Sequence, residues 1–160
     1  AMTGWRIGYT AGPLNVIKAM SSLQSQVASG SNSIAQYAAE EALRSPKGAA
    51  EIERMRKAYD ERRQHIVARL NAIDGLKCVM PKGAFYVMVD MSALIGKHLG
   101  DCEITGSMDF ASMLLENADV ALTPGSAFCA EGFCRISYAT SMENIDKGVD
   151  RIERFVKNLV

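Results

Sequence analysis

The chain has 160 residues, 48% of them hydrophobic and 22% charged, which is the composition of an ordinary globular protein. Its 18 basic and 18 acidic residues cancel, so no excess of charge predicts binding to nucleic acid or to an anionic membrane. No apolar run approaches the ~20 residues that span a bilayer, and no secretory leader is recognisable, so we expect a cytoplasmic protein.

The first third of the chain predicts one strand and two helices. Residues 5–13, WRIGYTAGP, have the pattern of a short strand that ends at Gly12-Pro13. Such a strand needs neighbours, so we interpret it as the edge of a larger sheet. Apolar residues at helical spacing then predict a helix after Pro13, and a small polar loop at residues 28–33 separates it from a second helix, which ends before Pro46.

The middle of the chain predicts a long helix followed by two strands. Residues 49–73 carry an apolar stripe at helical spacing, which Arg62 and Arg63 interrupt. A short strand is expected near residues 77–80. A second strand follows, in which two sets alternate as on a sheet with one buried face: Phe85, Val87 and Val89 against Tyr86, Met88 and Asp90.

The last third predicts an irregular segment, two further strands and two helices. Residues 93–106 show no clear period, and Ser107 is then expected to cap a helix. Strand-like runs cover residues 119–128 and 132–140. Thr140 to Glu143 has the pattern of a capping box that opens a final helix, whose apolar face holds Ile145, Val149, Ile152, Phe155 and Leu159. This order of elements predicts an α/β fold, or an α+β small domain, with a small mixed sheet packed against helices.

The four cysteines are Cys78, Cys102, Cys129 and Cys134, and they do not show the paired spacing of a zinc site. In a cytoplasmic protein such thiols stay reduced and usually serve as small core residues. We therefore expect no metal ion.

Arg135 is the most informative single residue, because it lies between Cys134 and Ile136 in a run that otherwise favours burial. A buried charge needs a partner, and the planar guanidinium binds a carboxylate through two parallel hydrogen bonds. Two interpretations stay open on this pattern alone. One is an internal ion pair with Asp or Glu, and the other is a site for the carboxylate of a ligand.

Arg6 raises the same question in the run GWRIGY, where Gly4 and Gly8 allow a ligand to approach the backbone closely. A phosphate could be bound by its guanidinium together with the hydroxyl of Thr3. The alternative is an arginine that stacks on Trp5 at the surface.

Other candidates for chemistry are weaker. His65 is expected to be solvated on the long helix, and His98 has no partner that the sequence identifies. Neither has the serine or cysteine that a nucleophilic pair requires. The glycine and hydroxyl residues at 30–33 lack the Gly-Lys-Ser/Thr of a phosphate-binding P-loop.

Four motifs follow one another in the order of a known family. Residues 1–13, AMTGWRIGYTAGP, resemble the segment after the cofactor lysine in class I aminotransferases of pyridoxal 5′-phosphate (PLP) fold type I. Residues 81–90, PKGAFYVMVD, resemble the family's Pro-x-Gly-Ala-Phe-Tyr strand. Residues 123–141 contain TPGSAF and FCRISYATS, which resemble its Pro-Gly-x-x-Phe and Arg-Ile-Ser-Tyr-Ala motifs. Residues 25–43 resemble a dimer-interface segment of bacterial-type aspartate and prephenate aminotransferases.

This resemblance implies roles for five residues. Arg6 matches the arginine that pairs with the phosphate of PLP, and Arg135 matches the arginine that binds the substrate α-carboxylate. Phe128 matches an aromatic residue that lines the substrate site. Ser31 and Asn32 fall in a loop that, in the family, approaches the active site of the partner subunit.

The chain departs from the family pattern in two places. Cys129-Ala130 stands where glycine usually follows the Pro-Gly-x-x-Phe motif, and Cys134 stands where a bulkier or β-branched residue is common. Neither departure changes a charged group.

The resemblance also implies what the rest of the protein supplies. The Schiff-base lysine is expected upstream of Ala1, so no catalytic residue is assigned within the chain. Residues 1–45 are expected to be the end of the PLP-binding large domain, and residues 46–160 the small C-terminal domain. The parent protein is expected to be a homodimeric aminotransferase for amino acids and 2-oxo acids, and the isolated fragment is expected to be inactive.

Three alternatives stay open. The chain could be a non-catalytic structural or binding domain, or part of another fold type I enzyme such as a carbon–sulfur lyase or a cyclopropane-forming synthase. It could also be the effector domain of a transcription regulator, which would need a helix-turn-helix upstream. The choice between aspartate, glutamate and prephenate is not set here, because the distal carboxylate is recognised mostly outside this region.

Overall fold

The computed structural model describes residues 2–160, which form two compact units. The first ends at Met55 and the second runs from Arg56 to Val160, so the division falls within the long helix α3 (Gly48–Asn71). The boundary expected between residues 45 and 46 stays a prediction, because a division by compactness need not coincide with one by domain.

The first unit contains the 3₁₀ helix η1 (Thr3–Trp5), α1 (Leu14–Ala28), α2 (Ser33–Arg44) and the start of α3. Helices α1 and α2 form where the apolar spacing of the sequence predicts them. Asn32 is the N-cap of α2, and its side-chain oxygen accepts a hydrogen bond from the Ala35 N–H at 3.0 Å. Most of the large apolar side chains of this unit are exposed, with Leu23, Val27 and Leu43 among them.

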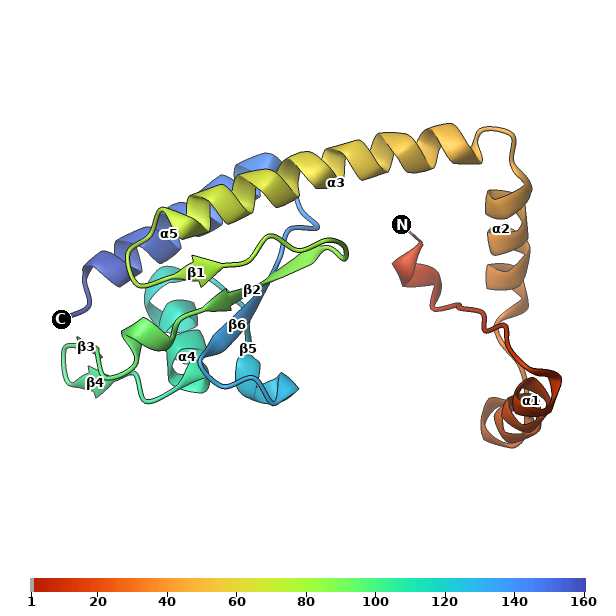
Figure 1. The fold of residues 1–160 in the computed structure, drawn as a ribbon, viewed down its shortest axis with the longest axis horizontal. Coiled ribbons are helices and arrows are strands. Elements are labelled where there is room, and N and C mark those ends of the chain that lie inside the picture. The colour runs from red at the N-terminus through yellow and green to blue at the C-terminus, as the bar shows by residue number, and fades with distance from the viewer. Residues whose placement is uncertain (1) are drawn as a thin grey trace. The chain divides into compact units, whose positions relative to one another are not determined.

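The strand predicted for residues 5–13 is wrong. The segment begins in the short helix η1 and then continues to α1 without regular structure, as the red part of Figure 1 shows. A strand exists only where a second strand completes its backbone hydrogen bonds, and within residues 2–160 none pairs with this segment.

The second unit is built on a four-stranded sheet, in the order β1 (Lys77–Cys78), β2 (Tyr86–Asp90), β6 (Phe133–Ser137) and β5 (Thr123–Pro124). Every neighbouring pair in it is antiparallel. The register places Arg135 beside Met88 on one neighbouring strand and beside Thr123 on the other. The predicted α/β class, with a small sheet packed against helices, is confirmed.

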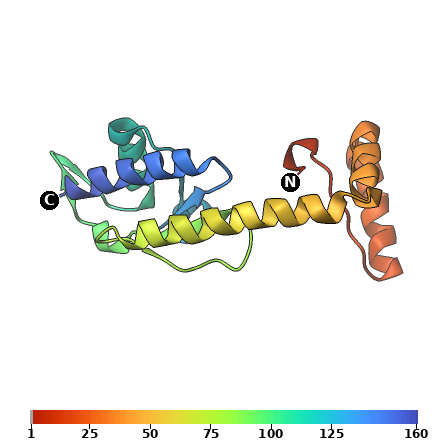
Figure 2. The same cartoon turned by 90° about the horizontal axis from the view of Figure 1, so that it is seen from above.

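Three helices pack on one face of this sheet and form the core with it. They are α3, α4 (Ser107–Ala118) and α5 (Met142–Lys157), and the last two appear with the sheet in Figures 1 and 2. The strands contribute Val87, Val89 and Cys134, all buried. The predicted alternation is confirmed within β2, whereas Phe85, assigned to the same set as Val87 and Val89, lies before the strand and is 42% exposed. The predicted apolar face of the last helix is confirmed. The helices and the segment after α5 contribute Ile66, Val67, Leu70, Phe110, Met113, Leu114, Ile145, Val149, Ile152, Phe155 and Leu159.

The opposite face of the sheet carries the alternate residues of the same strands. Tyr86, Met88 and Arg135 lie on it, and each is partly or largely exposed. The alternation that buries the valines of β2 therefore also turns Arg135 away from the core.

Helices α3 and α5 are joined by an ion-pair network at their surface. The Nε2 atom of His65 lies 2.6 Å from a carboxylate oxygen of Asp146, and Arg69 bonds to Asp146 at 2.7 Å and to Asp150 at 2.5 Å. The expectation that His65 is merely solvated is wrong, because α5 brings a carboxylate beside it.

Two predicted helix caps are shifted by one residue. Gly106 is the N-cap of α4. Ser107 is the first residue of the helix, and its side chain is fully buried. Ser141, not Thr140, caps α5, and its hydroxyl accepts a hydrogen bond from the Asn144 N–H at 3.2 Å. At α5 the adjacent hydroxyl residues Thr140 and Ser141 make the cap ambiguous in sequence, and at α4 the N-cap is a glycine without a side chain to signal it.

The segment expected to be irregular contains a small hairpin, formed by β3 (His98–Leu99) and β4 (Cys102–Glu103), after the 3₁₀ helix η2 (Ser92–Leu94). Gly100 has a left-handed backbone in the two-residue turn. A glycine followed by Asp101 between two short runs is the turn signal that could have predicted it. His98 exchanges two backbone hydrogen bonds with Val160, at 2.9 and 3.0 Å.

Tyr138 connects two of the sequence motifs. Its buried hydroxyl donates a hydrogen bond to the Ala84 carbonyl at 2.8 Å, and its N–H donates to the Phe85 carbonyl at 2.9 Å. Ala84 has a left-handed backbone, with φ of 66°. The tyrosine thereby fixes a strained residue just before β2.

Candidate active site

Arg135 projects from the middle of β6 onto the face of the sheet opposite the helices. Its guanidinium carbon lies 4.4 Å from the centroid of the Phe128 ring and 5.0 Å from that of Tyr86. Both distances are within the range of cation–π attraction. Two aromatic residues therefore flank a half-buried cation.

No carboxylate of the described residues forms an ion pair with this cation. Within residues 2–160, Arg135 makes neither an ion pair nor a side-chain hydrogen bond. The internal ion pair considered from the sequence is therefore absent from the described chain. The N–H groups of the guanidinium are left available to an anion, and their planar arrangement suits a carboxylate.

Phe128 is placed by a tight turn, the 3₁₀ helix η3 (Gly125–Phe128), which follows β5 directly. A side chain on Gly125 would bring its Cβ within 2.0 Å of the Ala130 carbonyl oxygen and 2.4 Å of the Phe133 carbonyl oxygen. Only glycine allows so close an approach of the two backbone segments. The Pro-Gly of this motif thus seats the turn against the start of β6.

Tyr86, to which the sequence motifs give no role, lies at the same place in the structure. Tyr86 lies diagonally across from Arg135 in the β2–β6 register, on the same face of the sheet. The neighbouring ring of Phe85 packs edge-on against it, with centroids 5.4 Å apart. The signal that could have found it is the alternation of residues 85–90, because that places Tyr86 on the face opposite the core.

Arg6 belongs to the first unit and follows η1 with a left-handed backbone, with φ of 51°. Its side chain is exposed, and its Nη1 donates one hydrogen bond to the Thr3 carbonyl at 3.3 Å. Within residues 2–160 there is no cation–π contact between Arg6 and Trp5. Most of the N–H groups of this guanidinium remain available.

Ser31 and Asn32 lie at the start of α2. The Ser31 carbonyl accepts a hydrogen bond from the Gln36 side chain at 2.9 Å, and Asn32 caps the helix. Asn32 also lines a surface hollow of about 420 Å³ with the residues around η1: Met2, Gly4, Trp5, Ile34 and Ala35. The first unit thus brings Asn32 near the segment that carries Arg6.

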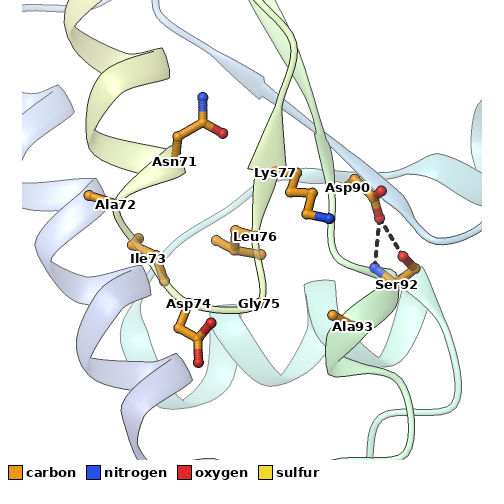
Figure 3. Close-up of a pocket in the computed structure, with 10 residues that line it drawn as sticks. All are labelled: Asn71, Ala72, Ile73, Asp74, Gly75, Leu76, Lys77, Asp90, Ser92 and Ala93. Carbon is orange, nitrogen blue, oxygen red and sulfur yellow. Dashed lines mark hydrogen bonds between the residues drawn. The ribbon is translucent and has the colours of Figure 1, made fainter.

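A second hollow, of about 510 Å³, lies where α3 meets β1 (Figure 3). Three of its polar side chains, those of Asn71, Asp90 and Ser92, are hydrogen-bonded to other groups of the protein. Asp90 accepts hydrogen bonds from Ser92 N–H and hydroxyl at 2.9 and 2.6 Å, which, helped by the charge of Lys77, hold the pKa of Asp90 below its ordinary value. Asn71 is likewise bonded to the backbone of Cys78 in both directions. None of the candidate site residues from the sequence lines this hollow.

The four cysteines differ in their exposure to solvent. Cys78 and Cys134 are buried and Cys102 and Cys129 are exposed, and all four are free thiols. Among residues 2–160 no group of three or more histidine, cysteine or acidic residues could hold a metal ion. Nor is any helix in this part of the chain long and apolar enough to cross a membrane.

A small sheet that buries one face against helices, and presents an unpaired arginine on the other, is an arrangement suited to binding a carboxylate. The family model described as aminotransferase class I and II matches residues 1–152. The chain therefore belongs to the class I and II aminotransferase family.

Relatives with assigned names agree with this membership. The chain is 46% identical over 157 residues to aspartate aminotransferase of Bacillus sp. strain YM-2, a match that covers 98% of this chain and 38% of the relative. It is 46% identical over 154 residues to aspartate/prephenate aminotransferase of Nitrosomonas europaea, covering 95% of this chain and 38% of the relative. Among solved structures, aspartate aminotransferase from Rhizobium meliloti superposes with a TM-score of 0.89 at 42% identity, over 99% of this chain and 40% of that one. The chain thus spans about two fifths of the length of these relatives.

Proposed function

We propose that this chain is the C-terminal part of a PLP-dependent aminotransferase that moves an amino group between an amino acid and a 2-oxo acid. The single observation that carries the proposal is Arg135, a half-buried cation between two aromatic rings with no carboxylate of the described chain beside it. Both substrates of a transaminase bear an α-carboxylate. One arginine at this place would serve both half-reactions.

Arg135 would hold the α-carboxylate through two parallel hydrogen bonds and so fix the orientation of the bonds at the α-carbon. The rings of Phe128 and Tyr86 would keep water from the guanidinium, which strengthens its attraction for an anion. Thr123, which neighbours Arg135 in the sheet, is half-buried and adds a hydroxyl on the same face.

The residues present fit the phosphate of PLP at Arg6. Its exposed guanidinium makes only one hydrogen bond, to a backbone carbonyl, and so keeps donors for a dianionic group. When bound, PLP supplies an electron sink for the bonds at the α-carbon of the substrate. The contribution of this chain is to hold the phosphate and the carboxylate, and the proton-moving Schiff-base lysine would lie upstream of Ala1.

The partners follow from the same family membership. The parent protein would be a cytoplasmic homodimer, with Ser31 and Asn32 in a loop that reaches the active site of the second copy. Their position at the exposed start of α2 is compatible with that role. No binding to nucleic acid or to a membrane is proposed.

The substrate is proposed to be aspartate or glutamate. The names of the relatives at 46% identity support the aspartate type, and one of them also names prephenate. All of these substrates bear the α-carboxylate that Arg135 would bind, so this residue does not choose between them.

The test uses the full-length protein that contains this chain, purified with PLP and supplied with aspartate and 2-oxoglutarate. Formation of oxaloacetate and glutamate in equal amounts is expected, and prephenate is tried as a second amino acceptor. Release of an oxo acid from a sulfur-containing amino acid without an acceptor would instead identify a lyase. The 160-residue chain alone, run beside it, is expected to give no product.

A further inference from the structure

Ser107 stands out as a polar residue in the core. Among the residues that the structure describes, it is the one buried residue with a small polar or charged side chain, and its exposed fraction is 0%. Its hydroxyl accepts a hydrogen bond from the Ser126 N–H at 3.1 Å. Ser126 belongs to η3, the turn that carries Phe128. A buried hydroxyl of α4 therefore holds the turn of the carboxylate site from behind.

Glu131 makes the second connection. Its carboxylate accepts hydrogen bonds from the Ser107 N–H at 2.5 Å and from the Gly132 N–H at 3.2 Å. These bonds keep the pKa of Glu131 below its ordinary value, with the Ser107 N–H as the main cause. The Gly132 carbonyl in turn accepts from the Met91 N–H at 2.8 Å. One carboxylate thus ties the start of α4 to the segment that enters β6.

The hydrogen bonds of Ser107 and of Glu131 lead to the two sides of the contact between Phe128 and Arg135. The branch through Ser126 ends at Phe128, and the branch through Gly132 ends at the strand of Arg135. Ser107 lies where the branches meet. Together with the pairing of β5 with β6 and the close approach at Gly125, this network holds the turn of Phe128 beside the strand of Arg135.

We propose that Ser107 and Glu131 are positioning residues that hold the Phe128 turn against Arg135 and thereby set the affinity of the carboxylate site. The inference rests on the proposed function, because it assumes that Arg135 binds a carboxylate. Neither residue touches the ligand. Each acts by keeping the site in its binding geometry before the ligand arrives, so that binding does not have to order the turn.

The experiment compares five forms of the full-length protein: wild type, Ser107→Ala, Glu131→Ala, Glu131→Gln and Ser112→Ala. The probe is maleate, a dicarboxylate without an amino group to transfer, and its Kd is measured by calorimetry. Ser107→Ala and Glu131→Ala should weaken binding about 3- to 10-fold, the effect of losing one or two neutral or charged hydrogen bonds. Glu131→Gln keeps an oxygen acceptor and should restore most of the affinity. Ser112→Ala, the same deletion at an exposed position of α4, should leave the Kd unchanged.

A second readout separates positioning from stability. In steady-state transamination, Ser107→Ala and Glu131→Ala should raise the KM of both aspartate and 2-oxoglutarate while kcat is retained. A residue that only stabilises the fold would lower the active fraction, and hence kcat, and leave the Kd of the folded fraction unchanged. Because Glu131 is exposed, its two variants decide the matter even if Ser107→Ala does not fold.

The outcomes distinguish this inference from the proposed function. Maleate binding by wild type, with the same Kd in Ser107→Ala and Glu131→Ala, overturns the positioning role alone. Equal losses in Glu131→Gln and Glu131→Ala also contradict it, because the acceptor would then not matter. No maleate binding and no transamination by wild type overturns the proposed function itself.

Discussion

The guanidinium of Arg135 lies against the ring of Phe128, at 4.4 Å from its centroid, although the two residues belong to different elements of the second unit. β5 pairs with β6 and leads directly into the turn that carries the phenylalanine. The contact is therefore built by the sheet register and by the close approach at Gly125, and not by closeness in sequence.

Replacing Arg135 with lysine should raise the KM of the full-length enzyme for both amino acid and 2-oxo acid by about 10- to 100-fold. Lysine keeps the charge but cannot form two parallel hydrogen bonds with a carboxylate, and it stacks less well on the rings. Steady-state kinetics with each substrate measures the effect. Arg154→Lys, at an exposed position of α5, is the matched control, and equal KM values for the two variants would remove Arg135 from the site.

Replacing Phe128 with leucine should weaken maleate binding about 2- to 5-fold, the size of an exposed cation–π contact. Leucine preserves apolar volume but removes the ring that faces the cation. Calorimetry gives the Kd, and Phe133→Leu serves as a control, because no cation lies over that half-exposed ring in the described chain. A larger loss in the control would show that the ring of Phe128 is not the relevant group.

The neighbouring leucines of α4 should differ sharply in their effect on stability. Leu114 is fully buried in the core, so Leu114→Ala should lower the free energy of unfolding by about 2–5 kcal/mol through lost contacts and a cavity. Leu115 is 54% exposed, and Leu115→Ala should change stability by roughly 0.5 kcal/mol or less. Urea denaturation followed by circular dichroism compares them. Similar costs for both would contradict the orientation of α4.

Asp146 should make stability depend on pH at the acidic end. The hydrogen bond from His65 and the charges of His65 and Arg69 hold its pKa below the ordinary value of 3.8. The folded protein then binds this proton less readily than the unfolded chain does. The stabilisation is therefore fully present above the ordinary value and is lost as the pH falls through the lowered pKa. Urea midpoints measured from neutral pH downward should fall less steeply for Asp146→Asn than for wild type, and parallel curves would argue against the His65–Asp146 pair.

The four thiols should react at two different rates. Burial raises the pKa of Cys134 to about 12 and of Cys78 to about 11, so almost no thiolate forms at neutral pH. Cys102 and Cys129 are exposed and should react first with a chromogenic disulfide reagent in the 160-residue chain. Addition of denaturant should release the other two, and rapid reaction of all four without it would mean that the second unit is not folded as described.

The parts of the fold that the sequence predicts well are those fixed by local period. The alternation of Val87 and Val89 indicates which face of β2 is buried, and the spacing from Ile145 to Phe155 indicates the buried face of α5. The strand expected near Arg6 failed because a strand depends on a partner, which local pattern does not supply. The hairpin at Gly100 was missed because its strands are two residues long, too short to show a period.

The sequence identifies only some of the residues of the candidate site. Arg135 and Phe128 could be named from motifs, but Tyr86 joins them through a cross-strand register that no local pattern sets. The position of Ser107 before an apolar helical run predicts a helix cap, whereas in the structure its hydroxyl is buried and accepts a hydrogen bond from the turn at Ser126. Long-range hydrogen bonds of this kind become apparent only once the helix and the turn are placed in space.

The hydrogen bond from the Tyr138 hydroxyl to the Ala84 carbonyl has a consequence for protein engineering. Donor and acceptor lie 54 residues apart in the sequence. In a chimera of two relatives whose crossover falls between residues 84 and 138, the donor and the acceptor of this hydrogen bond would come from different parents. Residues 81–90 and 133–141 should therefore be exchanged as a single cassette, with junctions placed in the loops outside both. A library designed in this way would inherit intact the paired strands β2 and β6, which carry Tyr86 and Arg135.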